Sequence, residues 1–256
     1  APISAMLSGL LIKVSGIYAL FRVIYSVIGI TPVLSRLLMA LGTVSMVVAA
    51  LLALGQKDIK RMLAYSSISQ VGYIVLGLAL GTPLGIAGAL FHLFNHAVAK
   101  GLLFLNSGSI QHITGTRNLE ELGGLGKKVP VTAGTNLVGS LSIAGVPPLA
   151  GFWSKLIIIM ALIQAREFGY ALVAILASIL TLWYYLLIQR KTFFGRVADR
   201  WLLVKEAPFW MSAANVVLAL ICILAGIFFS PIFKTWISPA AEALARGVQQ
   251  VLMWGL

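Results

Sequence analysis

The chain contains 256 residues, of which 60% are hydrophobic and only 10% are charged, and its mean hydropathy is +0.99. Soluble domains are about half apolar and a quarter charged, so this composition excludes an ordinary soluble enzyme as well as a disordered chain. The net charge of +12 could indicate a nucleic-acid-binding protein. We expect no nucleic acid, because the basic residues are scattered at the ends of apolar runs. The composition is that of a polytopic protein in a lipid bilayer.

Apolar runs long enough to cross a hydrocarbon core of about 30 Å determine the predicted fold. They fall at about 3–25, 36–54, 61–81, 85–108, 130–163, 168–189 and 207–230. The sequence therefore predicts an all-α integral membrane protein with about seven transmembrane helices. The fifth run is too long for one straight crossing, and Gly145-Val-Pro-Pro-Leu-Ala-Gly151 interrupts it. Because proline removes backbone donors, we expect one broken helix there.

The distribution of polar residues predicts two segments and an orientation. A transmembrane domain should cover 1–231, followed by an interfacial amphipathic tail at 232–256 that carries Glu242 and Arg246. Eleven of the 19 basic residues fall on one side of the predicted spans and five on the other. The positive-inside rule then predicts a cytoplasmic N-terminus and an external C-terminus. No cleavable signal peptide is expected in the first span.

Ionisable residues inside the predicted spans are the most informative feature of the sequence. The seven acids fall in loops or at helix ends, whereas Lys13, Lys100 and Lys155 fall within spans. A buried charge costs about 2.5 kcal/mol or more and indicates a function by default. Desolvation disfavours the ammonium form, and a second charge about 10 Å away adds roughly 1.7 kcal/mol of repulsion at a dielectric of 20. The lysines are candidate coupled proton stations; snorkelling to the interface is the alternative.

The fourth span carries a row of three ionisable residues. His92, His96 and Lys100 occur at i, i+4 and i+8, on one face of a helix and roughly 6 Å apart per step. Neutral imidazole donates and accepts, as a water-bridged proton relay requires. The histidines could instead only bond to neighbouring helices. A metal site is not expected, because no third ligand is near. We expect His112 in a loop beyond this helix, without a role.

Two further spans place a lysine at a structurally special position. Lys155 should lie beside the break, on the first turn of the resumed helix; a plain proline kink is the alternative. Asp58 should cap the third helix, where Lys60 either anchors the helix at the interface or admits protons. The serines after Lys60 could hold water or serve helix packing.

With one cysteine, Cys222, we expect neither a catalytic residue nor a cofactor.

Three long strings resemble a known family. They are Lys57-Asp-Ile-Lys-Arg-Met-Leu-Ala-Tyr-Ser-Ser-Ile-Ser-Gln-Val-Gly-Tyr73, Phe91-His-Leu-Phe-Asn-His-Ala-Val-Ala-Lys-Gly-Leu-Leu-Phe104 and Gly145-Val-Pro-Pro-Leu-Ala-Gly-Phe-Trp-Ser-Lys155. They are similar to the antiporter-like, proton-translocating membrane subunits of respiratory complex I, of Mrp-type Na⁺/H⁺ antiporters and of energy-converting membrane-bound hydrogenases. The resemblance implies two inverted five-helix repeats. This chain corresponds to the C-terminal half, with one repeat and flanking helices, so we expect a split subunit or a fragment.

The resemblance also assigns roles to individual residues. It implies that Lys13 links two half-channels and that Lys60 opens the tenth helix of the family. His92, His96 and Lys100 match the set in the eleventh helix, and Lys155 matches the ionisable residue of the broken twelfth helix. Gln70 departs from members that have histidine there, which could lower proton affinity.

The predicted function is ion translocation, with the proton as the expected ion, in a redox-driven or Mrp-type multisubunit complex. The chain itself would catalyse no redox chemistry and would serve as a pumping subunit of an oxidoreductase complex, such as an NADH dehydrogenase. Expected partners are the N-terminal half of the subunit, on the same or a separate chain, and other membrane subunits in a prokaryotic cell membrane. The alternatives are a structural spacer that conducts no ions and a component of a secondary Na⁺/H⁺ antiporter.

Overall fold

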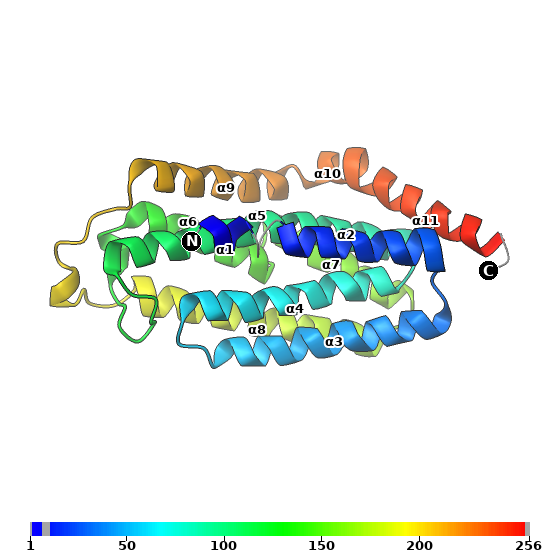
Figure 1. The fold of residues 1–256 in the computed structure, drawn as a ribbon, viewed down its shortest axis with the longest axis horizontal. Coiled ribbons are helices and arrows are strands. Elements are labelled where there is room, and N and C mark those ends of the chain that lie inside the picture. Colours follow the sequence, from blue (N-terminus) through cyan, green and yellow to red (C-terminus); the bar gives the residue numbers. More distant parts are fainter. Residues whose placement is uncertain (1, 7–10, 254–256) are drawn as a thin grey trace.

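The structure, a computed structural model, describes residues 2–6 and 11–253. Within these ranges the regular structure is helical, apart from an isolated bridge between Asp58 and Asn118. The longer helices lie along one common axis (Figure 1). The α-helices are α1 (Pro2–Ala5), α2 (Ile12–Val23), α3 (Pro32–Leu54), α4 (Ile59–Ala79), α5 (Pro83–Thr114), α6 (Pro130–Ala144), α7 (Ala150–Gln164), α8 (Phe168–Phe193), α9 (Phe209–Ile227), α10 (Phe229–Ile232) and α11 (Ser238–Met253).

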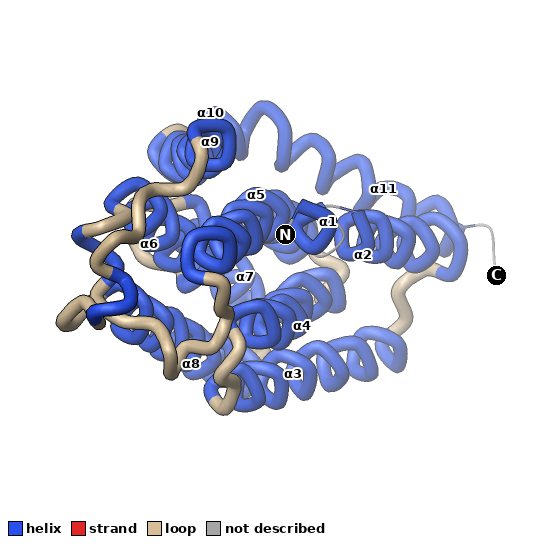
Figure 2. The backbone as a smooth tube through the Cα atoms, turned by 60° about the vertical axis from the view of Figure 1, so that its left-hand side comes forward, coloured by secondary structure: helices blue, strands red, loops and turns tan. Residues whose placement is uncertain are grey.

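Five of these helices, α3, α4, α5, α8 and α9, are long and apolar enough to cross a membrane. In α4 and α5, 72% and 78% of the most apolar window is buried, against 39% or less in the other three. The tube in Figure 2 shows α4 and α5 inside the bundle, with α3, α8 and α9 around them. The outer helices expose large apolar side chains, as lipid-facing helices do. The predicted class, an all-α membrane protein, is confirmed.

The predicted broken helix is confirmed as the pair α6 and α7. Gly145 ends α6 with φ +88°, a left-handed conformation that favours glycine, and Val146-Pro147-Pro148 continues as a turn. The helix resumes at Ala150, so Lys155 lies in the second turn of α7 and not in the first turn that the sequence suggested. The first span is described as α2 followed by a π-helical turn, Ile24–Ile28; its residues 7–10 lie outside the described residues.

Polar side chains mark the starts of the membrane helices. The carboxylate of Asp58 accepts from the backbone N–H of Arg61 at 3.0 Å, which confirms the predicted cap of α4. Thr82 caps α5 in the same way, with the Gly85 N–H at 3.1 Å. This helix continues to Thr114, where the left-handed Gly115 ends it. His112 therefore lies in the last turn of α5, and the expectation of a loop was wrong. The helix continues past the apolar run because its backbone hydrogen bonds do not require apolar side chains, and it ends only at Gly115.

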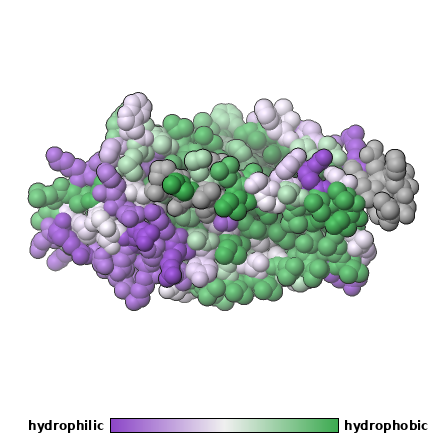
Figure 3. All heavy atoms as spheres, viewed as in Figure 1, coloured by the Kyte–Doolittle hydropathy of each residue, from purple (hydrophilic) through white to green (hydrophobic). Residues whose placement is uncertain are grey.

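Three polar connections, 55–58, 115–129 and 194–208, meet at one end of the bundle, which we call the basic end. Their backbones bond to one another, with Leu119 N–H donating to the Lys57 carbonyl at 2.8 Å and Gly124 N–H to the Phe194 carbonyl at 3.0 Å. Much of this end is hydrophilic in Figure 3, whereas the long flank is mostly apolar. Hydrogen bonds from Thr116, and then from Asn118, hold the pKa of Glu121 below its usual range. At the opposite end, α11 packs against α5 and the turn 24–28.

The backbones of helices α3 and α4 lie in contact at a pair of glycines, Gly42 and Gly72. A Cβ added to Gly72 would lie 2.8 Å from Met46 Cβ and 2.5 Å from the Gly42 carbonyl oxygen. Small residues permit such backbone contact between membrane helices. We expect Gly72→Val to separate the helices and to destabilise the protein by about 1–3 kcal/mol, lowering the midpoint of thermal unfolding in detergent.

The matched control is Gly134→Val, in α6, where an added Cβ meets no atom within 4 Å. Both substitutions change helix propensity alike, so the difference between their unfolding midpoints isolates the α3–α4 contact. Equal midpoints for the two variants would contradict the prediction.

Candidate functional site

The predicted row on the fourth span exists, and it is buried. His92, His96 and Lys100 lie on one uninterrupted stretch of α5, with no side chain of the three exposed to solvent. Eight residues of helix separate the ends of the row by about 12 Å. Lys100 is near the middle of the 32-residue helix and does not snorkel. The row therefore places three ionisable groups in the centre of the bundle.

Lys100 is held by neutral oxygen atoms from two other helices. Its Nζ donates to the Leu63 carbonyl at 3.1 Å and to the Ser66 hydroxyl, both in α4, and to the Tyr185 hydroxyl of α8 at 2.8 Å. The Tyr185 and Ser66 hydroxyls lie 3.2 Å apart, within hydrogen-bond distance. Because these oxygens accept a bond without carrying charge, they fix the amine and leave its charge uncompensated. The site can accommodate either protonation state of Lys100.

Lys155 lies beside the break, as predicted. Its Nζ donates to the carbonyl of Ala144, the last residue of α6, at 3.2 Å, and lies 4.7 Å from the centre of the Tyr73 ring. The end of a helix carries partial negative charge on its free carbonyls, and an aromatic face attracts cations. Both contacts stabilise an ammonium without a carboxylate. The side chain is 3% exposed, so this environment is almost fully closed.

His92 connects the row on α5 to the helix that resumes after the break, whereas His96 has no such contact within the described residues. His92 Nδ1 shares a hydrogen bond of 2.9 Å with the hydroxyl of Ser154, the residue before Lys155. Neither ring nitrogen of His96 has a hydrogen-bond partner among the described residues, although the side chain is fully buried. Buried polar groups are nearly always paired, with water where protein is out of reach. Water therefore suits the space around His96, between Lys100 and His92.

The two remaining predicted residues lie at the margins of the row. Lys60 is half-buried near the basic end and donates to Gln111 Oε1 at 2.8 Å. Lys13 is half-buried in α2 and lines a shallow apolar recess of about 240 Å³ against Ile68 and Val71 of α4. The structure thus joins His92 to the residue before Lys155, keeps His96 and Lys100 on the same helix, and leaves Lys60 and Lys13 at the margins.

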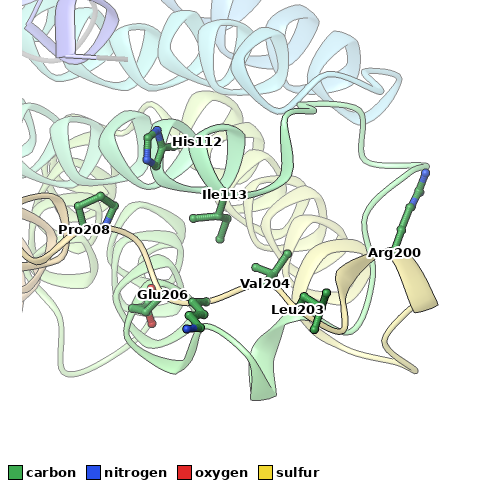
Figure 4. A pocket seen from close by; sticks show the side chains of 8 residues that line it. His112, Ile113, Arg200, Leu203, Val204, Glu206 and Pro208 are labelled. Carbon is green, nitrogen blue, oxygen red and sulfur yellow. The ribbon is translucent and has the colours of Figure 1, made fainter.

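The ligand oxygens were less predictable than the amines. From the sequence, Ser66 could either hold water or serve helix packing, and nothing distinguished Tyr185, Ser154 or Gln111. A tyrosine in an apolar span is a weak signal, because its ring packs equally well in a dry core. His112 lines a separate open pocket of about 530 Å³ at the basic end. Figure 4 shows this residue together with Glu206 and Arg200, which also line the pocket.

The fold and site define a helical membrane protein with amines and imidazoles in its interior. The family model for the transmembrane region of NADH:quinone oxidoreductase and Mrp antiporter subunits matches residues 1–181, and the chain belongs to this family. Subunit N of the NADH-quinone oxidoreductase of Desulforudis audaxviator is 39% identical over 188 residues, 72% of this chain and 37% of that protein. Subunit M of the F(420)H(2) dehydrogenase of Methanosarcina mazei is 34% identical over 253 residues, 97% of this chain and 51% of that protein.

Solved structures agree with this membership. A chain of the Mrp complex from Dietzia sp. DQ12-45-1b superposes with a TM-score of 0.86 at 27% identity, covering 95% of this chain and 54% of that one. A chain of respiratory complex I from Thermus thermophilus with bound NADH gives a TM-score of 0.76 at 30% identity, covering 84% and 45%. The chain thus spans about half, or less, of the length of these relatives.

Proposed function

We propose that this chain carries part of a proton path across the membrane, as a portion of an antiporter-like subunit in a larger complex. The observation that carries the proposal is the buried row on α5, in which Lys100 and His92 form hydrogen bonds with neutral oxygen atoms of the described residues. Protons enter at the basic end near Lys60, pass Lys13, Lys100, His96 and His92, and leave through Lys155. Each step between neighbouring groups is bridged by water or a hydroxyl.

Protons suit this interior better than sodium ions. Na⁺ is a hard cation that binds to sets of oxygen ligands, and the acids fall outside the buried row. Amines and imidazoles instead bind protons and repel metal cations when charged. The proposal therefore excludes a sodium site along the row, and leaves any sodium transport of a host complex to other subunits.

The proposed partners follow from two observations: the chain covers about half, or less, of the length of its relatives, and its flanks expose apolar side chains. The rest of an antiporter-like subunit, on the same or another polypeptide, would contact the recess at Lys13, and further membrane subunits would cover other apolar flanks. The excess of basic residues at the basic end supports a cytoplasmic location for that end, and the proposed membrane is that of a prokaryotic cell. The tail from about residue 232 would lie at the external interface.

The test is proton uptake by inverted vesicles that contain the complete host complex, energised by its substrate. We expect His96→Leu to slow uptake about tenfold, equivalent to 1.4 kcal/mol of barrier, because leucine cannot bond to water between Lys100 and His92. The control is His112→Leu, at the exposed end of α5, which should retain the wild-type rate.

The uptake is measured with and without sodium ions. An unchanged rate in His96→Leu would favour a structural spacer that conducts no ions through this chain. A wild-type rate that collapses without sodium would favour a sodium-coupled antiporter component.

A further inference from the structure

A second group of buried polar side chains lies between α6 and α8, apart from the row on α5. Gln189 of α8 donates from Nε2 to Asn136 Oδ1 of α6 at 2.7 Å and to the Ser140 hydroxyl at 3.2 Å. All three side chains are at most 4% exposed. Burying amide side chains in an apolar bundle costs free energy, so their presence needs a reason. The proton path proposed above does not use them.

The group continues toward the basic end. The Thr135 hydroxyl, one residue before Asn136, donates to Asn106 Oδ1 of α5 at 3.1 Å. The Asn106 amide nitrogen is fully buried and has no hydrogen-bond partner among the described residues. One turn earlier in α6, Thr132 bonds to the carboxylate of Glu206, in a connection of the basic end. Polar side chains thus extend from the surface connection into the bundle.

A cavity reaches this group from the same end. It has a volume of about 390 Å³, and Gln189 is part of its wall together with Gly124, Lys127, Gly134, Phe193 and Gly195. Gly124, Lys127 and Gly195 belong to the connections of the basic end, so the cavity joins that end to a buried amide. A water molecule occupies about 30 Å³ of liquid, so the space holds several.

The inner side of the group approaches Lys100. Gln189 and Tyr185 stand four residues apart in α8, so their side chains are neighbours on one face, with Cβ atoms about 6 Å apart. The Tyr185 hydroxyl accepts from Lys100 Nζ at 2.8 Å. A hydroxyl can pass on a proton by accepting one and donating another, whereas amides only orient water.

We propose that the cavity at Gln189 is a water-filled entrance that leads protons from the basic end to Lys100 through Tyr185. It is distinct from the entrance at Lys60, because Lys60 and its partner Gln111 do not line this cavity. This inference rests on the proposed function and adds the access route to the same amine. Gln189 is the positioning residue that holds the water at the cavity wall, and Asn136 and Ser140 fix its amide.

Thiol labelling of the complete host complex in inverted vesicles tests the entrance. Cys222, buried and the single cysteine, is first replaced by alanine. In that background we expect Gln189→Cys to react with a membrane-impermeant methanethiosulfonate added on the side of the basic end, and the reaction to slow proton uptake several-fold. Ala177→Cys, on the same helix and 1% exposed, is the control and should not react.

Leu137→Cys is the second reporter, because it lines the cavity, is 38% exposed and replaces no polar group. Its modification should also slow uptake. The inference is overturned if Gln189→Cys does not react from the basic end, or if uptake persists after both positions are modified. If the entrance is overturned in either way but Lys155→Ala still loses proton uptake, the proposed function stands without this entrance. Normal uptake in Lys155→Ala would contradict the proposed function and the entrance together.

Discussion

Lys155→Ala is expected to abolish proton translocation while leaving the complex assembled. The ammonium lies beside the free carbonyl of Ala144 and over the Tyr73 ring, at the one place where the described backbone of a spanning segment opens. It is the last protonatable group of the proposed path before the external side. Alanine removes the amine at the break that takes up the proton after His92 in the proposed path. The fall in uptake should exceed tenfold, more than 1.4 kcal/mol of barrier.

Two measurements separate this loss from a folding defect. The yield of intact complex should match the wild type, since alanine removes a costly buried charge and leaves a small cavity in its place. Lys234→Ala, an exposed lysine at the opposite end from the basic end, is the control and should translocate normally. Normal translocation by Lys155→Ala would refute the role assigned to this residue.

Lys100→Met should also stop translocation, and without loss of thermal stability. Methionine has nearly the volume of lysine and needs no solvation, so the free energy of unfolding should stay equal or rise. The path, however, loses the amine between Tyr185 and His96. The expected result is more than a tenfold fall in proton uptake with an unfolding midpoint that does not decrease.

The opposite pattern identifies a structural lysine. If Lys100 only ties α5 to α4 and α8 through Leu63 and Tyr185, then Lys100→Met lowers the unfolding midpoint and leaves proton uptake intact. Tyr185→Phe refines the result, because it keeps the amine and removes one hydroxyl. We expect it to slow uptake less than Lys100→Met does.

The membrane class and most helix boundaries could be predicted because they depend on local chemistry. A run of apolar residues must become a helix in lipid, and a cap such as Asp58 or a breaker such as Pro147 acts within one turn. The end of α5 was predicted too early, because the prediction followed hydropathy alone. Residues beyond the apolar run stay helical until Gly115, and hydropathy does not register that.

The candidate site was predictable only in part. Lysine and histidine in an apolar span stand out in any sequence, since their burial is costly and needs a reason. Tyr185 and Gln189 do not stand out, because tyrosine and glutamine near the end of a span are common at interfaces. The contact of Tyr185 with Lys100 joins residues 85 positions apart, and spacing along one helix cannot reveal it.

By itself, the sequence determined that this chain crosses a membrane, where its helix breaks, and which residues carry protonatable groups inside it. These properties follow from transfer free energies and backbone geometry, which each segment has independently of the others. Only the tertiary structure decided that Lys100 bonds to neutral oxygens and that Lys155 reaches the end of α6. It also brought a buried amide on α8 to a cavity at the basic end. Such relations depend on how helices distant in sequence pack, and packing is a property of the whole bundle.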